Sequence, residues 1–172
     1  MNFLELAKSR YSVRKYQNRA VETEKLTVLL EAGRVAPTAG NQQPCVFLVL
    51  NDKAAIEKLA HACNPHGAPL AIVVCADKSI AWVRPFDHAS MIEVDSSIAA
   101  DHIMMCAQDL ELSSCWITYF NPAILRKDFN IPDNLVPVNI IVIGYRDENP
   151  LSPDRHEQTR KPLNSIVKYT TF

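Results

Sequence analysis

The chain has 172 residues, and its 18 Lys and Arg residues nearly balance its 19 Asp and Glu residues, for a formal net charge of −1. This balance argues against the extended positive field of proteins that bind nucleic acids or anionic membranes. The length fits one domain over residues 1–172 with its own core. Apolar runs end well before the roughly twenty residues needed to span a membrane, and no secretory signal is visible. Five isolated cysteines without a CxxC pair fit a reducing compartment, so we expect a cytoplasmic protein.

Helices and strands alternate along the first half of the sequence. A short helix is expected to begin near Phe3 and to end before Arg10. Apolar residues at helical spacing predict a second helix over residues 21–35, which Pro37 stops. Continuous apolar runs over residues 45–50 and 70–75 predict strands buried on both faces, with a helix over residues 52–62 between them.

The second half continues the alternation. A long helix is predicted over residues 90–110, followed by a strand over 115–120, a short helix over 122–129 and a strand over 138–145. The tail from residue 149 is rich in proline and charge and ends in a strand-like run over 165–169. This order of elements indicates a layered α/β or α+β domain.

The segment from Arg10 to Arg14 is a candidate phosphate clamp. If it is extended, Arg10, Ser12 and Arg14 lie on one face, where two guanidinium groups and a hydroxyl suit a dianionic phosphate. If it is helical, Ser12 points away and the two arginines repel each other. A surface role is the alternative, with the arginines paired to Glu5 or Glu24.

Glycine is scarce, with only four residues in the chain and neither a GxGxxG nor a GxxxxGK[ST] motif. The backbone loops that usually cradle phosphates are therefore missing, and side chains must bind any phosphorylated ligand. This requirement favours the clamp reading of Arg10, Ser12 and Arg14.

An amide-rich loop over residues 37–44 follows the second predicted helix and leads into a strand. Asn41, Gln42 and Gln43 could bind a flat ligand with polar edges, because amides both donate and accept hydrogen bonds. They could instead be ordinary turn and cap residues.

Three further groups of residues are candidates of other kinds. His61, Cys63 and His66 lack the spacing of a structural zinc site, and we expect no metal. Seven-residue steps place His88, Asp95 and His102 on one face of the long predicted helix. A loop before that helix contains a possible substrate pocket: Trp82, Arg84 and Phe86.

Five motifs in register resemble the nitroreductase family of FMN-dependent oxidoreductases over residues 3–167. They are Arg10-x-Ser12-x-Arg14, Pro37-Thr38-x-x-Asn41-x-Gln43-Pro44, Cys115-Trp116-Ile117, Gly144-Tyr145 and Arg160-Lys161-Pro162-Leu163. The resemblance implies an α+β fold with a mixed, mainly antiparallel sheet flanked by helices. It also implies an intertwined homodimer that holds FMN between its subunits, with the tail from about residue 149 to 172 reaching the partner.

The resemblance also implies roles for individual residues. Arg10, Ser12 and Arg14 would hold the phosphate and ribityl side of FMN, with backbone contacts from Tyr11 and a second phosphate contact from Arg160. The flavin would be lined by Pro37, Thr38, Asn41 and Gln43 and by main-chain groups of Ile117 and Thr118. Cys45 and the segment 111–113 depart from the family pattern, which often has Trp and a Gly-rich turn there. The helix with Asp95 and His102 would pack at the dimer interface.

The implied activity is the reduction of nitroaromatics, quinones or similar electrophilic small molecules by NAD(P)H, in two steps through FMN. The cofactor then performs the chemistry, so no side chain is expected to be catalytic. Two alternatives stay open: a non-catalytic flavin-binding sensor or carrier, and a specialised flavin dehalogenase or dehydrogenase of the same family.

Overall fold

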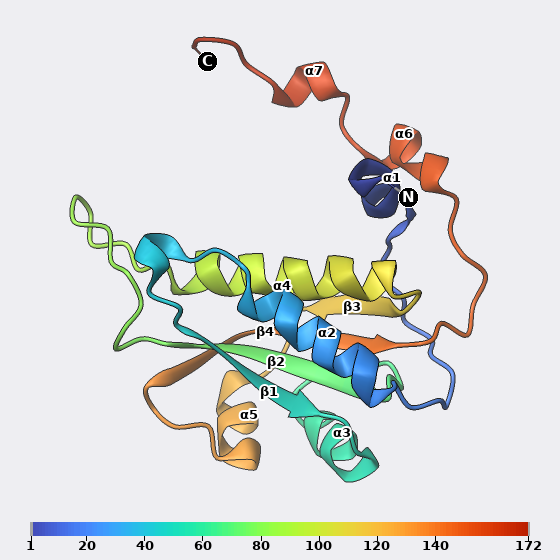
Figure 1. The fold of residues 1–172 in the computed structure, drawn as a ribbon, viewed down its shortest axis with the longest axis horizontal. Helices are drawn as coiled ribbons and strands as arrows, with labels where there is room; N and C mark the ends of the chain where they lie inside the picture. The colour runs from blue at the N-terminus through green and yellow to red at the C-terminus, as the bar shows by residue number, and fades with distance from the viewer. Residues whose placement is uncertain (1, 172) are drawn as a thin grey trace.

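The computed structural model describes residues 2–171, so residues 1 and 172, the outer ends of the predicted domain, lie outside the described part. A four-stranded sheet forms the centre, with strand order β1 (Cys45–Leu50), β2 (Leu70–Asp77), β4 (Leu135–Gly144) and β3 (Ser113–Ile117). All neighbouring strands are antiparallel. In Figure 1, α2 (Thr23–Arg34) and α4 (Ile92–Asp109) lie above the sheet, and α3 (Lys53–Leu59) and α5 (Pro122–Phe129) lie below it. This architecture confirms the α+β prediction.

The core consists of two apolar layers, one on each face of the sheet. Alternate residues of β2 belong to different layers: Ile72 packs with Leu29 and Ile103 of the upper helices, whereas Val73 packs on the side of α3 and α5. β2 is apolar over most of its length because both of its faces are covered. Each fully buried aliphatic side chain stabilises this arrangement by about 1.5–3 kcal/mol.

β1 has the predicted bounds, but the prediction that it is buried on both faces is wrong. Only Leu50 is buried, and Val46 is exposed. The reason is position rather than composition, because β1 is an edge strand whose one neighbour is β2. Part of its upper face borders an open cavity instead of a packed helix.

Several boundaries differ from the prediction. α3 ends at Leu59 instead of residue 62, and β3 ends at Ile117, so Thr118 to Phe120 leave the sheet. The chain turns there because Asn121 caps α5, its side chain accepting from the Ala123 and Ile124 N–H groups. α4 begins at Ile92 because residues 83 and 90 form a bridge that closes the preceding loop. His88 therefore lies outside the helix.

The N-terminal helix and the first part of the C-terminal tail meet beside the C-terminal end of α4. α1 (Phe3–Ser9) leads into an extended segment that bridges Ser12 to Ser114 in parallel and Tyr16 to Arg146 in antiparallel fashion. The tail contains η2 (Pro153–Arg155), α6 (His156–Thr159) and α7 (Leu163–Ile166). The predicted strand over 165–169 is wrong, because α7 occupies its first part and the projecting tail has no neighbouring strand to pair with.

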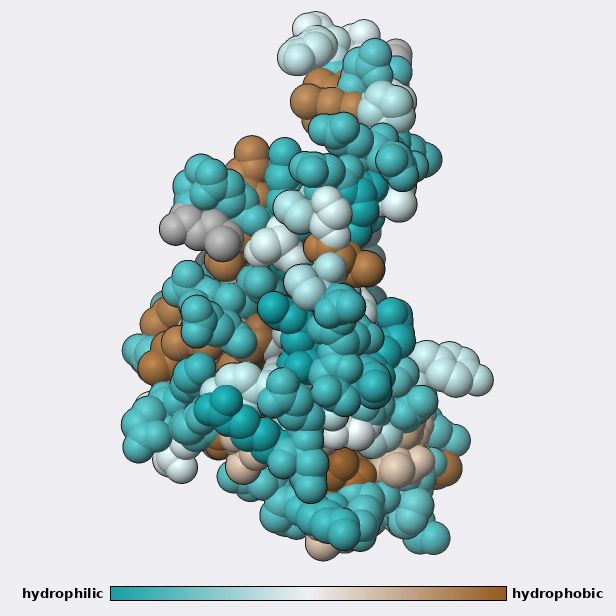
Figure 2. Space-filling view, turned by 90° about the vertical axis from the view of Figure 1, so that its right-hand side faces the viewer, coloured by the Kyte–Doolittle hydropathy of each residue, from teal (hydrophilic) through white to brown (hydrophobic). Residues whose placement is uncertain are grey.

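The end of the molecule that carries the tail is shown in Figure 2. Its surface is largely hydrophilic, with apolar groups in small separate patches, and the tail projects beyond the body. Within residues 2–171, no helix combines the length and apolarity that crossing a membrane requires.

Candidate functional site

The segment carrying the predicted clamp is extended. Tyr11 and Val13 are buried in the core, whereas Ser12 is half-buried and Arg14 is exposed. Because side chains alternate along an extended chain, Arg10, Ser12 and Arg14 share the other side. The structure thus has the conformation on which the clamp hypothesis depends.

The sheet and the core fix this segment in place. The Val13 N–H donates to the Ser114 carbonyl of β3 at 3.1 Å. The Tyr16 hydroxyl is buried and donates to the Val13 carbonyl at 2.9 Å. Burial raises the pKa of Tyr16, so this phenol is protonated and can donate at neutral pH. The clamp therefore rests on rigid elements rather than on a free N-terminus.

Positive charge gathers at the clamp without a matching set of carboxylates. Within residues 2–171, Arg10, Arg14 and Arg160 form no ion pair, whereas Arg19, Arg34 and Arg84 each have one. Burial lowers the pKa of Arg10, and the nearby Arg155 lowers it further, against an opposing effect of Asp101 on α4. Arg160 also lowers it, so the charge of the C-terminal arginine acts on Arg10, while its contact with a phosphate stays a prediction. The alternative, a pairing of Arg10 or Arg14 with Glu5 or Glu24, is not formed within the described residues.

Two more residues lie beside the clamp. Burial raises the pKa of Cys115 on β3, and Arg14, Ser12 and Arg10 around it act in the opposite direction. Burial lowers the pKa of His66, and Arg14 lowers it too. In the sequence, His66 stands out only as a possible metal ligand. His66 and Arg14 are 52 positions apart, so no local pattern reveals that the fold brings them near each other.

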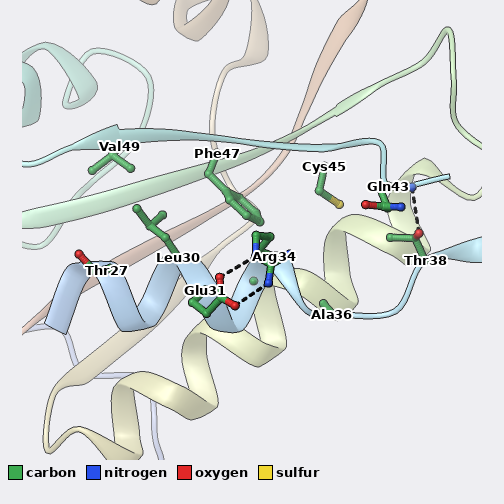
Figure 3. A pocket seen from close by; sticks show the side chains of 11 residues that line it. Thr27, Leu30, Glu31, Arg34, Ala36, Thr38, Gln43, Cys45, Phe47 and Val49 are labelled. Atoms are coloured by element: carbon green, nitrogen blue, oxygen red, sulfur yellow. Dashed lines mark hydrogen bonds and ion pairs between the residues drawn. The ribbon is translucent and has the colours of Figure 1, made fainter. Parts of the chain in front are cut away.

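The amide loop folds back on itself. The 3-10 turn η1 (Ala39–Asn41) interrupts it, and Asn41 and Gln43 both have positive φ angles of 54° and 53°. The Thr38 hydroxyl accepts from the Gln43 N–H at 3.0 Å (Figure 3). Pro37, Asn41 and Gln43 are exposed, and the Gln43 side-chain amide donates to the Asn41 carbonyl at 3.2 Å.

A cavity of about 710 Å³ lies between α2 and β1 and reaches the amide loop. Figure 3 shows Thr38, Gln43 and Cys45 at its loop end and apolar side chains such as Phe47 further along β1. The bidentate Arg34–Glu31 pair, with both N–O distances 2.6 Å, borders it on α2. Burial raises the pKa of Cys45, which keeps this thiol protonated at neutral pH.

Asp95 holds the amide loop to the start of α4. It is 1% exposed, and its Oδ1 accepts from the Ala39 N–H at 2.9 Å, while Oδ2 has no hydrogen-bond partner among residues 2–171. The predicted shared face is wrong for His88, which is in the loop before α4, whereas Asp95 and His102 both lie in α4; His102 bonds the Ile98 carbonyl of its own helix through Nδ1. The seven-residue spacing singles out Asp95, but its contact with Ala39 has no local signal in the sequence.

The three candidate substrate-pocket residues are separated by the structure. Trp82 lies against the amide loop, since a Cβ at Gly40 would be 3.0 Å from its Cδ1. Arg84 is committed to a bidentate pair with Asp87 within the loop, at 2.8 and 2.6 Å. Phe86 is 93% exposed at the tip. Only Trp82 is beside a predicted flavin-lining segment.

The candidate metal residues also separate. His61 Nδ1 contacts Asp128 Oδ2 at 2.8 Å, which links α5 to the residues after α3. In the described part of the chain, no three His, Cys, Asp or Glu side chains are placed to hold a metal ion.

The clamp and the amide loop lie at opposite ends of α4 within one protomer (Figure 1). Beside the clamp, Gln108 of α4 donates to the Ser9 hydroxyl at 3.1 Å, whereas the loop contacts Asp95. These two α4 residues are 13 positions apart, which corresponds to about 20 Å along the helix. Ser114 of β3 bridges to Ser12 of the clamp, and Ile117 ends the same strand, with Thr118 directly after it.

Comparison with known proteins gives the family. The nitroreductase family profile matches residues 7–65 and 57–145. A Methanothermobacter thermautotrophicus protein with the provisional name NADH dehydrogenase/NAD(P)H nitroreductase is 32% identical over 169 residues, covering 93% of this chain and 85% of the relative. A nitroreductase family protein of Clostridium difficile 630 has a solved structure with a TM-score of 0.98 and 52% identity, over the full length of both chains. An FMN-dependent nitroreductase of Clostridium difficile R20291 has a TM-score of 0.81 and 29% identity, covering 98% of this chain and 99% of that one. The chain therefore belongs to the nitroreductase family.

Proposed function

We propose that the protein reduces nitroaromatic, quinone or similar electrophilic small molecules with NAD(P)H, in two successive steps through bound FMN. As a member of the nitroreductase family, it is an FMN-dependent NAD(P)H oxidoreductase. FMN supplies the hydride chemistry, because its ring system accepts two electrons and passes them on. The chain binds and orients the cofactor, and no side chain is assigned a catalytic role.

The arginine cluster is the observation that carries this proposal. Uncompensated guanidinium groups repel each other, and a dianionic phosphate would relieve the repulsion and accept their hydrogen bonds. We assign the phosphate to Arg10, Ser12, Arg14 and Arg160. The backbone of Tyr11 contributes beside them, since its side chain is buried away from the clamp.

The flavin end of the site needs a second copy of the chain in our proposal. Because the amide loop and the clamp are at opposite ends of α4, an antiparallel homodimer would bring the loop of one protomer toward the clamp of the other. We assign the flavin contacts to this loop and to the β3 end: Pro37, Thr38, Asn41 and Gln43, with Ile117 and Thr118. Trp82, adjoining Gly40, is the substrate-facing residue that we propose from the loop before α4.

The tail supports the same assembly. Leu163, Ile166 and Tyr169 are 73%, 63% and 86% exposed, although they are apolar or aromatic. Burying them on a partner would recover the free energy that apolar exposure costs. We propose that the tail docks on a second copy, and that the protein works in the cytoplasm, where its five free cysteines stay reduced.

The first test is the visible spectrum of the purified protein, followed by release and identification of its ligand. We expect bound FMN, oxidation of NADH or NADPH, and transfer to an added quinone or nitroaromatic compound. Flavin that binds without turnover with either donor would favour a sensor or carrier. Turnover confined to a halogenated phenol would favour a dehalogenase.

The sharper test is the double variant Arg10→Ala with Arg14→Ala. Removing two charge-assisted contacts should weaken FMN binding roughly 100-fold or more, with an unchanged circular dichroism spectrum. Arg19→Ala with Arg34→Ala is the matched control, because it removes the same charge from surface ion pairs. FMN affinity equal to that of the control would place the phosphate elsewhere.

A further inference from the structure

Arg155, in the tail, attaches to the chain on both sides of the C-terminal end of α1. Its Nη1 donates to the Lys8 carbonyl at 3.0 Å and to the Ser152 carbonyl at 2.8 Å, and its Nη2 donates to the Arg10 carbonyl at 2.6 Å. The last carbonyls of a helix lack partners within the helix, and the Lys8 carbonyl is satisfied from the tail by Arg155 and by His156 Nε2 at 3.1 Å. One guanidinium thus joins η2 to the residue that opens the clamp.

The contacts of Arg155 leave its charge without a carboxylate partner. Within residues 2–171, all of its hydrogen bonds go to backbone carbonyls, and its guanidinium carbon lies 5.8 Å from the centre of the Tyr11 ring. No ion pair of Arg155 is formed within residues 2–171. A second positive charge therefore stands beside Arg10, where it is unfavourable in the absence of an anion.

We infer that Arg155 is a positioning residue for the phosphate clamp and makes the site select a phosphorylated flavin over the same flavin without its phosphate. This inference rests on the proposed function. By holding the Arg10 carbonyl, Arg155 fixes the direction in which the Arg10 side chain leaves the backbone. Its planar fork bonds three carbonyls at once, which the single ammonium of lysine cannot do with the same geometry.

The test compares binding of FMN and riboflavin, which lacks the phosphate, to wild type, Arg155→Ala and Arg155→Lys. Fluorescence quenching at fixed ionic strength gives both dissociation constants. For Arg155→Ala we expect FMN affinity to fall roughly tenfold or more and riboflavin affinity to stay within about twofold. Arg155→Lys keeps the charge but not the fork and should lie between the two.

Arg126→Ala is the matched control. Arg126 also donates to backbone carbonyls, those of Pro132 and Leu135. It is a residue of α5, which covers the face of the sheet opposite to α4. Its loss should leave the preference for FMN over riboflavin unchanged.

The outcomes separate this inference from the proposed function. If wild type binds FMN but Arg155→Ala keeps the full preference, or loses FMN and riboflavin equally, the inference is overturned alone. If wild type does not bind FMN, the proposed function fails and the inference with it. Should the alanine variant not fold, Arg155→Lys decides: a reduced preference supports the inference, and an unchanged one overturns it.

Discussion

The single bond between Asp95 and Ala39 should determine how firmly the amide loop is held. Asp95→Ala removes a hydrogen bond from a backbone N–H to a carboxylate, which is worth about 1.5–3 kcal/mol. The same change also removes a buried oxygen that has no partner within residues 2–171, and that relief offsets part of the loss. We therefore expect Asp95→Ala to lower the free energy of unfolding by about 1–2 kcal/mol.

Asp95→Asn separates the two effects. The amide oxygen can still accept from the Ala39 N–H, while the charged oxygen without a partner within residues 2–171 is replaced by a neutral amide NH2 group, which is also unpartnered there. The free energy of unfolding of the asparagine variant should therefore lie within about 1 kcal/mol of that of wild type and should be higher than that of the alanine variant. Because the loop lines the flavin in our proposal, FMN affinity should follow the same order.

Urea denaturation at equal protomer concentration measures these differences, since an oligomer's stability depends on concentration. Glu93→Ala is the matched control: Glu93 is the other acidic residue in the first turn of α4, so its removal changes the helix dipole interaction without touching the loop. An Asp95→Ala variant as stable as Glu93→Ala would contradict this role of Asp95. So would an Asp95→Asn variant that loses as much free energy of unfolding as Asp95→Ala.

Two further predictions concern the end of β4. Gly144→Ala should lower the free energy of unfolding by about 1–3 kcal/mol, because the added Cβ would be 2.6 Å from Cδ of the rigid Pro69 ring and 3.0 Å from Tyr16. An unchanged melting temperature would contradict this expectation and show that the neighbouring atoms move aside freely. The Tyr145 hydroxyl donates to Glu22 and, with Arg19, lowers the pKa of Glu22 to about 2. Tyr145→Phe should raise this pKa toward the ordinary 4.5. In wild type, the stability contributed by ionised Glu22 is present above pH 4.5 and is lost as the pH falls toward 2. An NMR titration of Glu22 gives the pKa in both proteins, and a value of about 2 in the variant would contradict the assignment to Tyr145.

Local patterns predicted the elements whose causes are local. α5 has the predicted bounds because Asn121 caps its start, Pro122 occupies its first position and Asn130 ends it in the left-handed conformation. The extended clamp was predictable for a similar reason, since a two-residue alternation is visible in the sequence itself.

The errors share a different cause, which is position in the assembled fold. β1 reads as a buried strand, yet its place at the sheet edge exposes it. The run over 165–169 has apolar residues typical of strands but no partner strand in the described chain. The bonds from Asp95 to Ala39 and from Arg155 to Arg10 join residues 56 and 145 positions apart, so no local spacing could reveal them.

The anchoring of the clamp also sets when it can form. Ser12 bridges to Ser114, and Tyr16 bridges to Arg146, which are 102 and 130 residues further along the chain. During synthesis, which proceeds from the N-terminus, the clamp residues emerge first but have nothing to dock on until β3 and β4 have been made. Closing such long loops is slow, because the chain loses conformational entropy before the stabilising contacts between the distant segments have formed. The nascent chain should therefore acquire its phosphate site among the last steps of folding, although it carries those arginines from the start.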